Sequence, residues 1–222
     1  MKMAFFQVLV SPTAAFERLR ERGGWIVALL LVSALSVATT YLQWPLIEKE
    51  MLAQFEAQQQ PLGAAEMDMV LQISRVTAWV TGAVMPAALM FFVGLLLFLL
   101  NMIVRGEGTY MQLSKVSLYS MIPGLLGGLL TTALAMAFDA DSITDVMLNG
   151  GVLFSEKTGF LFTLVSSVLD PFGLWSLVLT VVGAAVMMRK SPKSVAFWIV
   201  GAWLLVRLGT SLFALIPAAP AA

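Results

Sequence analysis

Two charged residues lie inside long apolar runs, where an isolated charge is costly. Arg207 lies twelve residues into the run 195–216, and Asp170 is the only acidic residue inside any comparable run. In a hydrocarbon layer such residues are usually paired or hydrated, and they often mark ion or substrate pathways. Two kinds of chemistry therefore fit them: a structural ion pair between helices, or a polar path through a small transporter or channel subunit.

The spacing of these two charges predicts that they approach each other in the outer half of a helix bundle. Counted from the basic turn at 189–193, Asp170 lies about 28 Å and Arg207 about 21 Å away at 1.5 Å per residue. Three alternatives stay open. Asp170 stands before Pro171, as the N-cap of a helix does, and Arg207 can extend its guanidinium towards water. Arg75 is a competing partner for Asp170.

The residue types that most enzymes use are missing from this chain. It contains no cysteine and no histidine, which excludes disulfides, thiol chemistry, His/Cys zinc sites and Ser-His-Asp triads. The segment Gly106-Glu-Gly108 is too short for a phosphate-binding loop and lacks its lysine. We therefore expect no catalytic residues, no cofactor, no metal and no nucleic-acid partner.

The composition is that of a protein embedded in a lipid bilayer. Hydrophobic residues make up 59% of the 222 positions and charged residues 12%, and the mean hydropathy is +0.90. Spans of roughly 20 apolar residues are predicted at 25–44, 76–104, 117–138 and 195–216, with a fifth in the part of 160–188 that follows Pro171. The part before it, 160–169, is too short to cross and is expected to be interfacial or re-entrant. The predicted fold is all-α: a polytopic membrane protein with five transmembrane helices plus short interfacial helices.

Charge placement indicates the orientation of these spans. If the five spans alternate, nine basic residues fall on one side and three on the other, and one crossing more or fewer would misplace the turn at 189–193. The nine are Lys2, Arg18, Arg20, Arg22, Arg105, Lys115, Arg189, Lys190 and Lys193; the three are Lys49, Arg75 and Lys157. We therefore expect a cytoplasmic N-terminus, a cytoplasmic Ser191 and an external C-terminus at Ala222.

The acidic residues follow the opposite distribution. Nine lie on the predicted outer side and three, Glu17, Glu21 and Glu107, on the inner side. The inner face therefore nets nine minus three, or +6, and the outer face three minus nine, or −6. An inner face of this kind favours anionic lipid headgroups or an acidic partner, although the same asymmetry also arises when charge serves topology alone.

Three segments follow from these boundaries: a cytoplasmic amphipathic N-terminal segment at 1–24, a five-helix domain at 25–216 and a short tail at 217–222. In the first, Ser11-Pro12 predicts the start of a short helix that runs to Arg22, with Phe16 and Leu19 on one side. That helix is expected to lie in the inner headgroup layer, or else to form an ordinary cytoplasmic arm.

The inner loop after the second span has a recognisable pattern. Gly106 and Gly108 end the long helix, and Thr109 can cap a new interfacial helix in which Tyr110 and Leu113 lie one turn apart. Gly106, Gly108 and Tyr110 form a candidate recognition loop; the alternative is a plain turn.

Small residues on the third predicted span indicate a close helix contact. Gly124 and Gly128 are four positions apart and Thr132 follows, while Gly201 and Gly209 form a looser version on the last span. Packing within one chain is the simpler interpretation, and a face for homo-oligomer formation is the alternative.

Four motifs in order give the chain a resemblance to a known family. They are Ser11-Pro12 followed by Phe16; Gly106-Glu-Gly-Thr-Tyr110; Tyr119-Ser-Met-Ile-Pro123; and Leu169-Asp-Pro-Phe172 followed by Trp175. In order and spacing the chain resembles the bacterial form of the Yip domain family, the Ypt/Rab-interacting membrane proteins. The resemblance implies a non-enzymatic membrane protein whose partners are the lipid bilayer and a membrane-protein or GTPase-type partner.

The expected function is that of a scaffold or membrane-organising partner of the Yip type. The alternative is the transporter or channel subunit that would use Asp170 and Arg207. The lack of cysteine, the abundance of alanine and leucine and the short loops indicate a bacterial inner-membrane protein.

Overall fold

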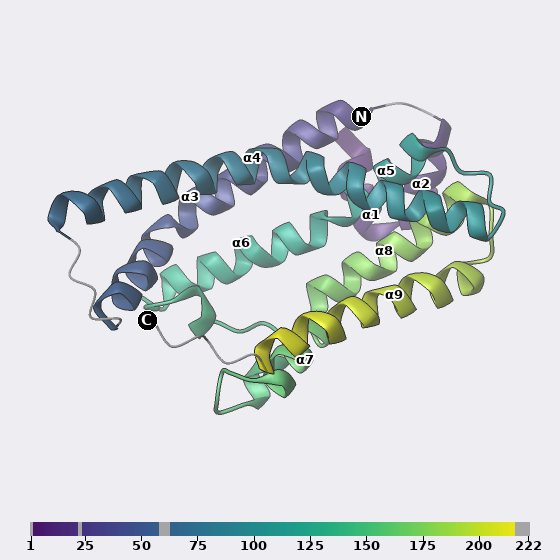
Figure 1. The fold of residues 1–222 in the computed structure, drawn as a ribbon. Coiled ribbons are helices and arrows are strands. Elements are labelled where there is room, and N and C mark those ends of the chain that lie inside the picture. Colours follow the sequence, from purple (N-terminus) through teal and green to yellow (C-terminus); the bar gives the residue numbers. More distant parts are fainter. Residues whose placement is uncertain (1, 22–23, 58–62, 216–222) are drawn as a thin grey trace.

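The computed structural model describes residues 2–21, 24–57 and 63–215, and every regular element in these ranges is a helix (Figure 1). The predicted tail at 217–222 and the external Ala222 lie outside the described residues. The elements are α1 (Lys2–Val10), α2 (Pro12–Glu21), α3 (Trp25–Ala57), α4 (Ala64–Ile103), α5 (Tyr110–Ser120), α6 (Ile122–Ala137), η1 (Ile143–Asp145), η2 (Gly150–Leu153), α7 (Phe160–Val168), α8 (Pro171–Met188), α9 (Pro192–Leu212) and η3 (Phe213–Leu215).

The prediction of five spans is confirmed for the described part of the chain. Five helical segments are long and apolar enough to cross a membrane: α3, α4, the α5–α6 pair, α8 and α9. The helices α3 and α4 run side by side along one edge of the molecule, α8 and α9 form the opposite edge, and α6 lies between them (Figure 1). The protein is an all-α, polytopic membrane protein.

The two longest helices continue through proline. Helix α3 continues through Pro45, so the predicted span 25–44 and the segment after it form one helix of 33 residues. Pro86 lies inside α4, whose 40 residues give a length of about 60 Å at 1.5 Å rise. A bilayer core of about 30 Å cannot contain that length. The C-terminal part of α3 and the N-terminal part of α4 extend past the ends of the other helices (Figure 1).

A new helix begins at Tyr110, as the inner-loop pattern predicts. The Thr109 hydroxyl accepts the backbone N–H of Gln112, and the Gln112 side chain accepts the N–H of Thr109, which completes a capping box. The helix is buried in the bundle, however, and does not lie on its surface. All residues from Leu113 to Ser120 are buried between α4, α8, α2 and α3, and α6 continues after a break at Met121. Packing overrides the expectation because the apolar residues of α5 occur on every face.

The amphipathic helix in the N-terminal segment also forms, with a different neighbour from the one expected. It starts at Pro12, and Ala15, Phe16 and Leu19 are its buried residues. Phe16 is fully buried against Gly183 of α8 and belongs to the main hydrophobic core. The expected headgroup anchor is therefore corrected: protein, rather than lipid, covers the apolar side of α2, and α2 packs as part of the helical bundle.

The break predicted before Pro171 is confirmed. Helix α7 ends at Val168, and α8 begins at Pro171 with Asp170 as its N-cap. At the same end of the molecule, Ser142 donates its hydroxyl to the Glu50 carboxylate, which ties the loop after α6 to the outer part of α3. The loop 138–159, named the outer loop because it lies on the side predicted to be external, thus forms one packed region with α7 and the start of α8.

Close helix contacts occur at glycines other than the predicted pair. A Cβ at Gly94 would lie 2.7 Å from the Ser114 Cα, and one at Gly127 would lie 2.6 Å from the Phe172 ring. By contrast, the nearest atom to a Cβ at Gly124 is 4.0 Å away, and at Gly128 it is 3.7 Å away. Gly124 and Gly128 therefore do not form the close contact. One turn of helix separates residues four apart, but only the fold decides which row of small residues meets a neighbour.

Candidate functional site

Asp170 caps α8 with both oxygens of its carboxylate. The backbone N–H groups of Phe172 and Gly173 donate to these oxygens at 3.1 and 3.0 Å. The first N–H groups of a helix have no partner within the helix, and a carboxylate there is also favoured by the helix dipole. The N-cap alternative for Asp170 is therefore the one that the structure contains.

Arg207 and Arg75 bind elsewhere, so the predicted pairing is wrong. Within the described residues, no cation lies within 4.0 Å of the Asp170 carboxylate; Arg207 lies over the Trp203 ring at 5.4 Å, and Arg75 pairs with Glu48 at 3.1 Å. The depth count placed Asp170 and Arg207 at similar heights, but backbone donors already satisfy the carboxylate. The transporter alternative loses the charge pair on which it rested.

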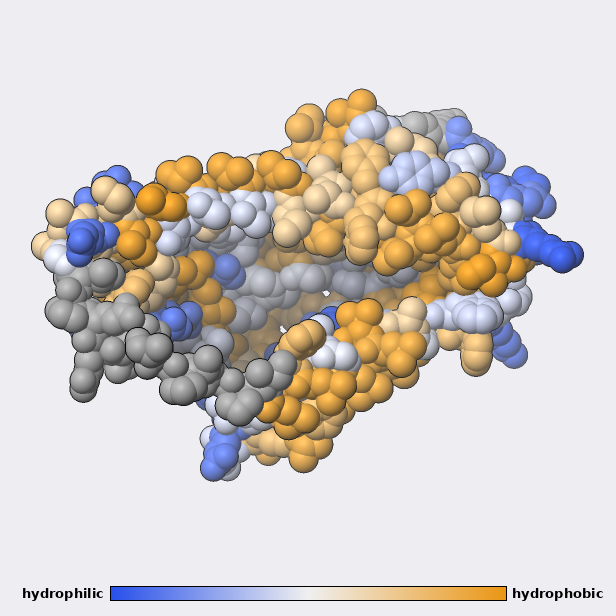
Figure 2. Space-filling model, viewed as in Figure 1, coloured by the Kyte–Doolittle hydropathy of each residue, from blue (hydrophilic) through white to orange (hydrophobic). Residues whose placement is uncertain are grey.

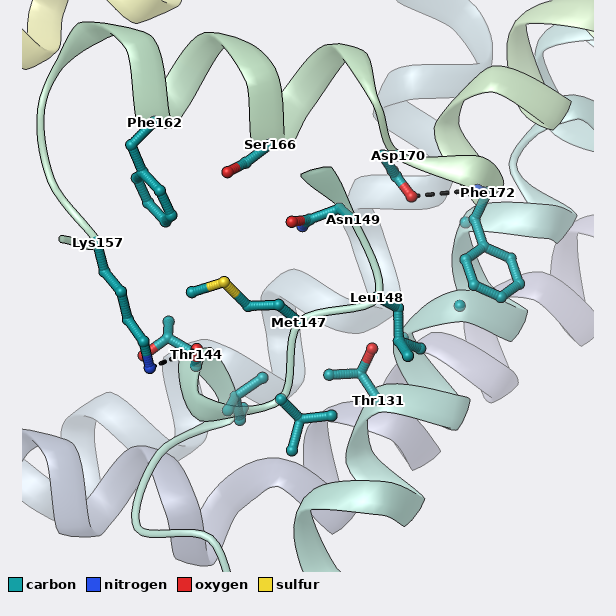
Figure 3. Close-up of a pocket in the computed structure, with 15 residues that line it drawn as sticks. Thr131, Thr144, Met147, Leu148, Asn149, Lys157, Phe162, Ser166, Asp170 and Phe172 are labelled. Atoms are coloured by element: carbon teal, nitrogen blue, oxygen red, sulfur yellow. Dashed lines mark hydrogen bonds between the residues drawn. The ribbon is translucent and has the colours of Figure 1, made fainter. Parts of the chain in front are cut away.

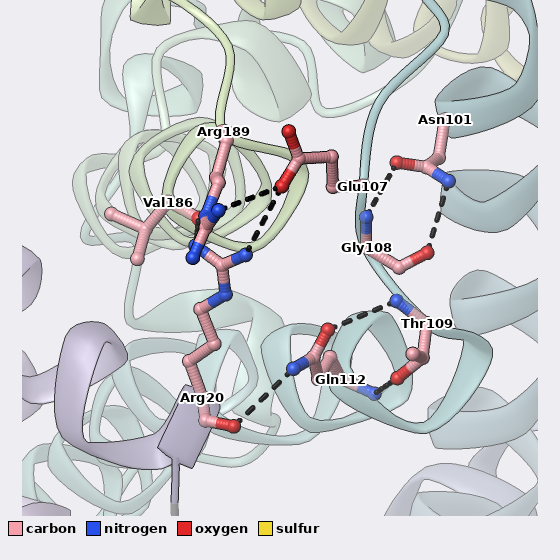
Figure 4. A network of polar contacts seen from close by, with 8 residues as sticks. All are labelled: Arg20, Asn101, Glu107, Gly108, Thr109, Gln112, Val186 and Arg189. Carbon is pink, nitrogen blue, oxygen red and sulfur yellow. Dashed lines mark hydrogen bonds and ion pairs between the residues drawn. The ribbon is translucent and has the colours of Figure 1, made fainter.

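At the opposite end of the molecule, Asn101 closes the loop after α4. Its side-chain amide accepts the N–H of Gly108 at 3.1 Å and donates to the Gly108 carbonyl at 3.0 Å (Figure 4). Asn101 is buried, and a Cβ at Gly106 would lie 2.9 Å from the Met188 Cβ. The two loop glycines therefore allow close packing against Asn101 and the end of α8.

An acidic residue from this loop joins α2 to α8. Glu107 accepts a hydrogen bond from Arg189 at 2.9 Å and lies 3.9 Å from the Arg20 guanidinium (Figure 4). The Glu107 N–H also donates to the carbonyl of Met188 at 3.1 Å. One carboxylate thus lies between two cations from segments far apart in the sequence, and it holds them against the same loop.

The C-terminal end of α2 is capped by side chains of α5. Lys115 donates to the carbonyl of Leu19 at 2.9 Å, and Gln112 donates to the carbonyl of Arg20 at 3.3 Å. The last carbonyls of a helix lack partners within the helix, and a cation there is stabilised by the helix dipole. This explains a buried lysine in α5, and it fixes α2 to the bundle.

Of the candidate recognition residues, Tyr110 also makes contacts within the chain. Its hydroxyl donates to the carbonyl of Phe91 at 3.1 Å, and its ring packs beside Phe91 and Phe98. Gly106, Gly108 and Tyr110 thus come together in one loop, which they brace against α4 and α8. Their role in recognition stays a prediction, and it depends on the surface around this loop.

That surface carries basic side chains that bind nothing else in the described chain. Arg105, Lys190 and Lys193 make no ion pair and no side-chain hydrogen bond with any described residue, while Arg105 and Lys193 are exposed. Arg105 and Arg189 also end α4 and α8 in the left-handed backbone conformation. The turns that follow α4 and α8 therefore present cations at the same end as the Glu107 network.

A second site lies around Asp170, at the end predicted to be external. A cavity of about 480 Å³, open on one side, is lined by α6, the outer loop, α7 and the start of α8 (Figure 3). Lys157 donates to Asp145 at 2.9 Å near one end of it, and this hydrogen bond lowers the pKa of the Asp145 carboxyl below its ordinary value. Gly124 and Gly128, the predicted packing glycines, are among the residues that line this cavity.

Sequence reasoning missed Asn101, Glu107 and Lys115 as organising residues. Asn101 is the only amide within the apolar span 76–104, and a polar residue in such a span usually has a specific partner. That signal would have identified Asn101. Glu107 and Lys115 gave no comparable signal, because charged residues near a loop are ordinary.

Comparison with known proteins places these features in context. The family model described as the Yip1 domain matches residues 6–215 of the chain. Membrane protein YknW of Bacillus subtilis (strain 168) is 26% identical over 182 residues, which cover 82% of this chain and 77% of that protein. No solved structure matches the chain.

Proposed function

The chain belongs to the Yip1 domain family, and from that premise we propose that it is a non-enzymatic membrane-organising protein whose basic inner end recruits an acidic partner. The observation that carries this proposal is the packed surface that α2, the inner loop and the end of α8 form at that end, here called the platform. The Glu107 network and the Asn101–Gly108 contacts hold α2, the inner loop and the end of α8 together.

The platform combines fixed backbone with uncommitted charge. Arg105 follows the end of α4 and Lys193 lies in the first turn of α9, so the backbone at both cations is held by hydrogen bonds. Preorganisation lowers the entropic cost of binding, and clustered cations attract acidic protein surfaces and anionic headgroups. A surface of this kind suits a partner with a clustered acidic patch, such as an acidic membrane protein or a partner of GTPase type.

The proposal includes an orientation. The inner end is taken as cytoplasmic, with α1 and α2 on the cytoplasmic side of a bacterial inner membrane, because basic residues are retained on that side. In this orientation the platform faces the compartment in which soluble acidic partners occur.

The test neutralises two platform cations and compares the result with an outer lysine. Arg105→Gln/Lys193→Gln and the control Lys49→Gln are purified from native membranes in mild detergent, and the accompanying proteins and lipids are identified. The double variant should lose an acidic partner that the native protein and the control retain, and rising salt should weaken the native interaction. Recovery of the same partners by all three proteins would overturn the proposal.

A further inference from the structure

The outer cavity contains polar groups that the fold leaves without partners. Ser166 Oγ is buried and forms no hydrogen bond with any described residue, and Figure 3 shows this hydroxyl directed into the cavity from α7. The Thr131 hydroxyl on the opposite wall likewise has no partner in the described chain. A buried polar atom without a partner costs free energy, so the Ser166 hydroxyl indicates an occupant that supplies a hydrogen bond, and the accessible Thr131 hydroxyl is available to the same occupant.

The cavity also has a negative charge that no side chain neutralises. Asp170 lies at one end, and its two capping hydrogen bonds occupy one acceptor position on each oxygen, whereas a carboxylate oxygen can accept two. Lys157, near the other end, already pairs with Asp145, and two of its three N–H donors are used by Asp145 and the Thr144 carbonyl. The two charged lining residues sum to zero, but Asp145, beside the cavity, pairs with Lys157, so the three charges together come to −1 and one donor of Lys157 is left over.

These groups select for a particular ligand chemistry. A primary ammonium brings one positive charge and three donors, which matches Asp170 together with the hydroxyls of Ser166 and Thr131. A quaternary ammonium has the charge but no N–H donor, and a purely anionic group would meet Asp170 unfavourably. A phosphate beside the ammonium would match the remaining donor of Lys157.

The surroundings of the cavity suit a lipid. Asp170 lies at the end of α8, whose 18 residues are about 27 Å long at 1.5 Å per residue, close to the edge of a bilayer core of about 30 Å. Phe162, Phe172 and Met147 contribute apolar walls, and the adjacent α6 exposes Leu126 and Leu130. A hollow opens between the α3–α4 side and the α8–α9 side of the molecule, and acyl chains can enter it (Figure 2).

We propose that the outer cavity binds the headgroup of a phospholipid that carries a primary ammonium, with the ammonium at Asp170 and the phosphate towards Lys157. This site is separate from the inner platform and does not depend on the function proposed for it. It assigns a specific role to the acidic residue that lies deepest in the apolar sequence.

The test uses delipidated full-length protein and synthetic lipids with identical acyl chains. Binding of phosphatidylethanolamine, phosphatidylcholine and phosphatidylglycerol is titrated by native mass spectrometry. The native protein should bind phosphatidylethanolamine most tightly. Asp170→Asn should weaken that binding about tenfold and remove the preference, because a charged hydrogen bond is lost. Asparagine is also a preferred N-cap residue, and its single amide oxygen can keep one of the two capping hydrogen bonds, so α8 should still begin at Pro171.

Three further variants keep the experiment decisive. Asp141→Asn makes the same chemical change at an exposed outer residue away from the cavity, and its lipid preference should equal that of the native protein. If Asp170→Asn does not fold, Thr131→Val and Ser166→Ala take its place, each with an expected loss of several-fold for phosphatidylethanolamine. Unchanged preference in the folded cavity variants would overturn the proposal.

A competition experiment distinguishes the lipid from a soluble amine of the same chemistry. Soluble glycerophosphoethanolamine presents the same ammonium and phosphate without acyl chains. Weak competition at millimolar concentration supports the lipid as the occupant. If the soluble compound binds in an Asp170-dependent manner while the lipid is not retained, the lipid assignment is wrong.

Discussion

The side chain of Asn101 forms two hydrogen bonds with the backbone of Gly108: it accepts the N–H at 3.1 Å and donates to the carbonyl at 3.0 Å. A single amide at the end of α4 thereby satisfies both backbone groups of a buried glycine. This contact anchors the loop that carries Glu107, so the arrangement of the inner end depends on Asn101.

Replacing Asn101 with leucine should therefore destabilise the protein, although the two side chains are similar in size. The change leaves two buried backbone groups of Gly108 without partners, at about 1–3 kcal/mol each. Thermal unfolding in detergent is the measurement, and Gln72→Leu, at an exposed position on the same helix, is the control. Equal stability of Asn101→Leu and the control would show that the contact contributes little.

Gly94→Ala should lower stability, whereas Gly201→Ala should not. A Cβ at Gly94 would lie 2.7 Å from the Ser114 Cα and force α4 and α5 apart, at a cost of about 1–3 kcal/mol. No atom lies within 4 Å of a Cβ at Gly201, and alanine is the better helix former. Both variants are compared by thermal unfolding, and a stable Gly94→Ala protein would contradict the close approach.

The corrected glycine contact on α6 gives a second matched pair. Gly127→Ala should disturb packing against the Phe172 ring, while Gly124→Ala should be tolerated, since its nearest neighbour is 4.0 Å away. Equal effects of the two changes on thermal stability would argue against the assignment of Gly127 as the packing glycine.

A double-mutant cycle on Asp170 and Arg207 should give additive effects. Asp170→Ala should cost about 0.5–2 kcal/mol through loss of the N-cap, and Arg207→Gln should lose only its contact with Trp203. Residues without a shared contact usually add to within about 0.5 kcal/mol. Strong coupling in detergent unfolding experiments would mean that the two charges interact in solution.

The outer loop should become less ordered at acidic pH. The hydrogen bond from Lys157 lowers the pKa of Asp145 in the folded protein, so its contribution is present above the unfolded pKa and is lost as the pH falls through the folded pKa. Limited proteolysis of the loop should therefore increase on acidification. Asp145→Asn should remove this dependence, and an identical pH profile in that variant would refute the assignment.

The orientation can be tested by single cysteines, because the chain has none. Lys193→Cys should react with a membrane-impermeant maleimide only after cells are opened, since the exposed start of α9 is predicted to be cytoplasmic. Asp141→Cys, which replaces an exposed outer residue, should react in intact cells. Labelling of Lys193→Cys in intact cells would reverse the proposed orientation.

The sequence by itself determined the architecture, because the bilayer imposes it. Runs of about 20 apolar residues must form helices there, since helices satisfy their own backbone groups, and the count of five spans follows from their lengths. Local signals were equally dependable. Thr109 before Tyr110 and Asp170 before Pro171 are caps in the structure because a cap depends on residues two or three positions away.

The tertiary structure alone decided which side chains meet. Asp170 and Arg207 were matched by depth, but depth leaves open the rotation of each helix and the competition from nearby backbone donors. The same limit applies to Gly127 and Gly124, three positions apart on α6, of which only Gly127 faces Phe172. It applies also to Phe16, whose burial against α8 required contact between segments more than 160 residues apart. Such contacts depend on how helices rotate and pack, which the hydrophobicity of each helix does not specify.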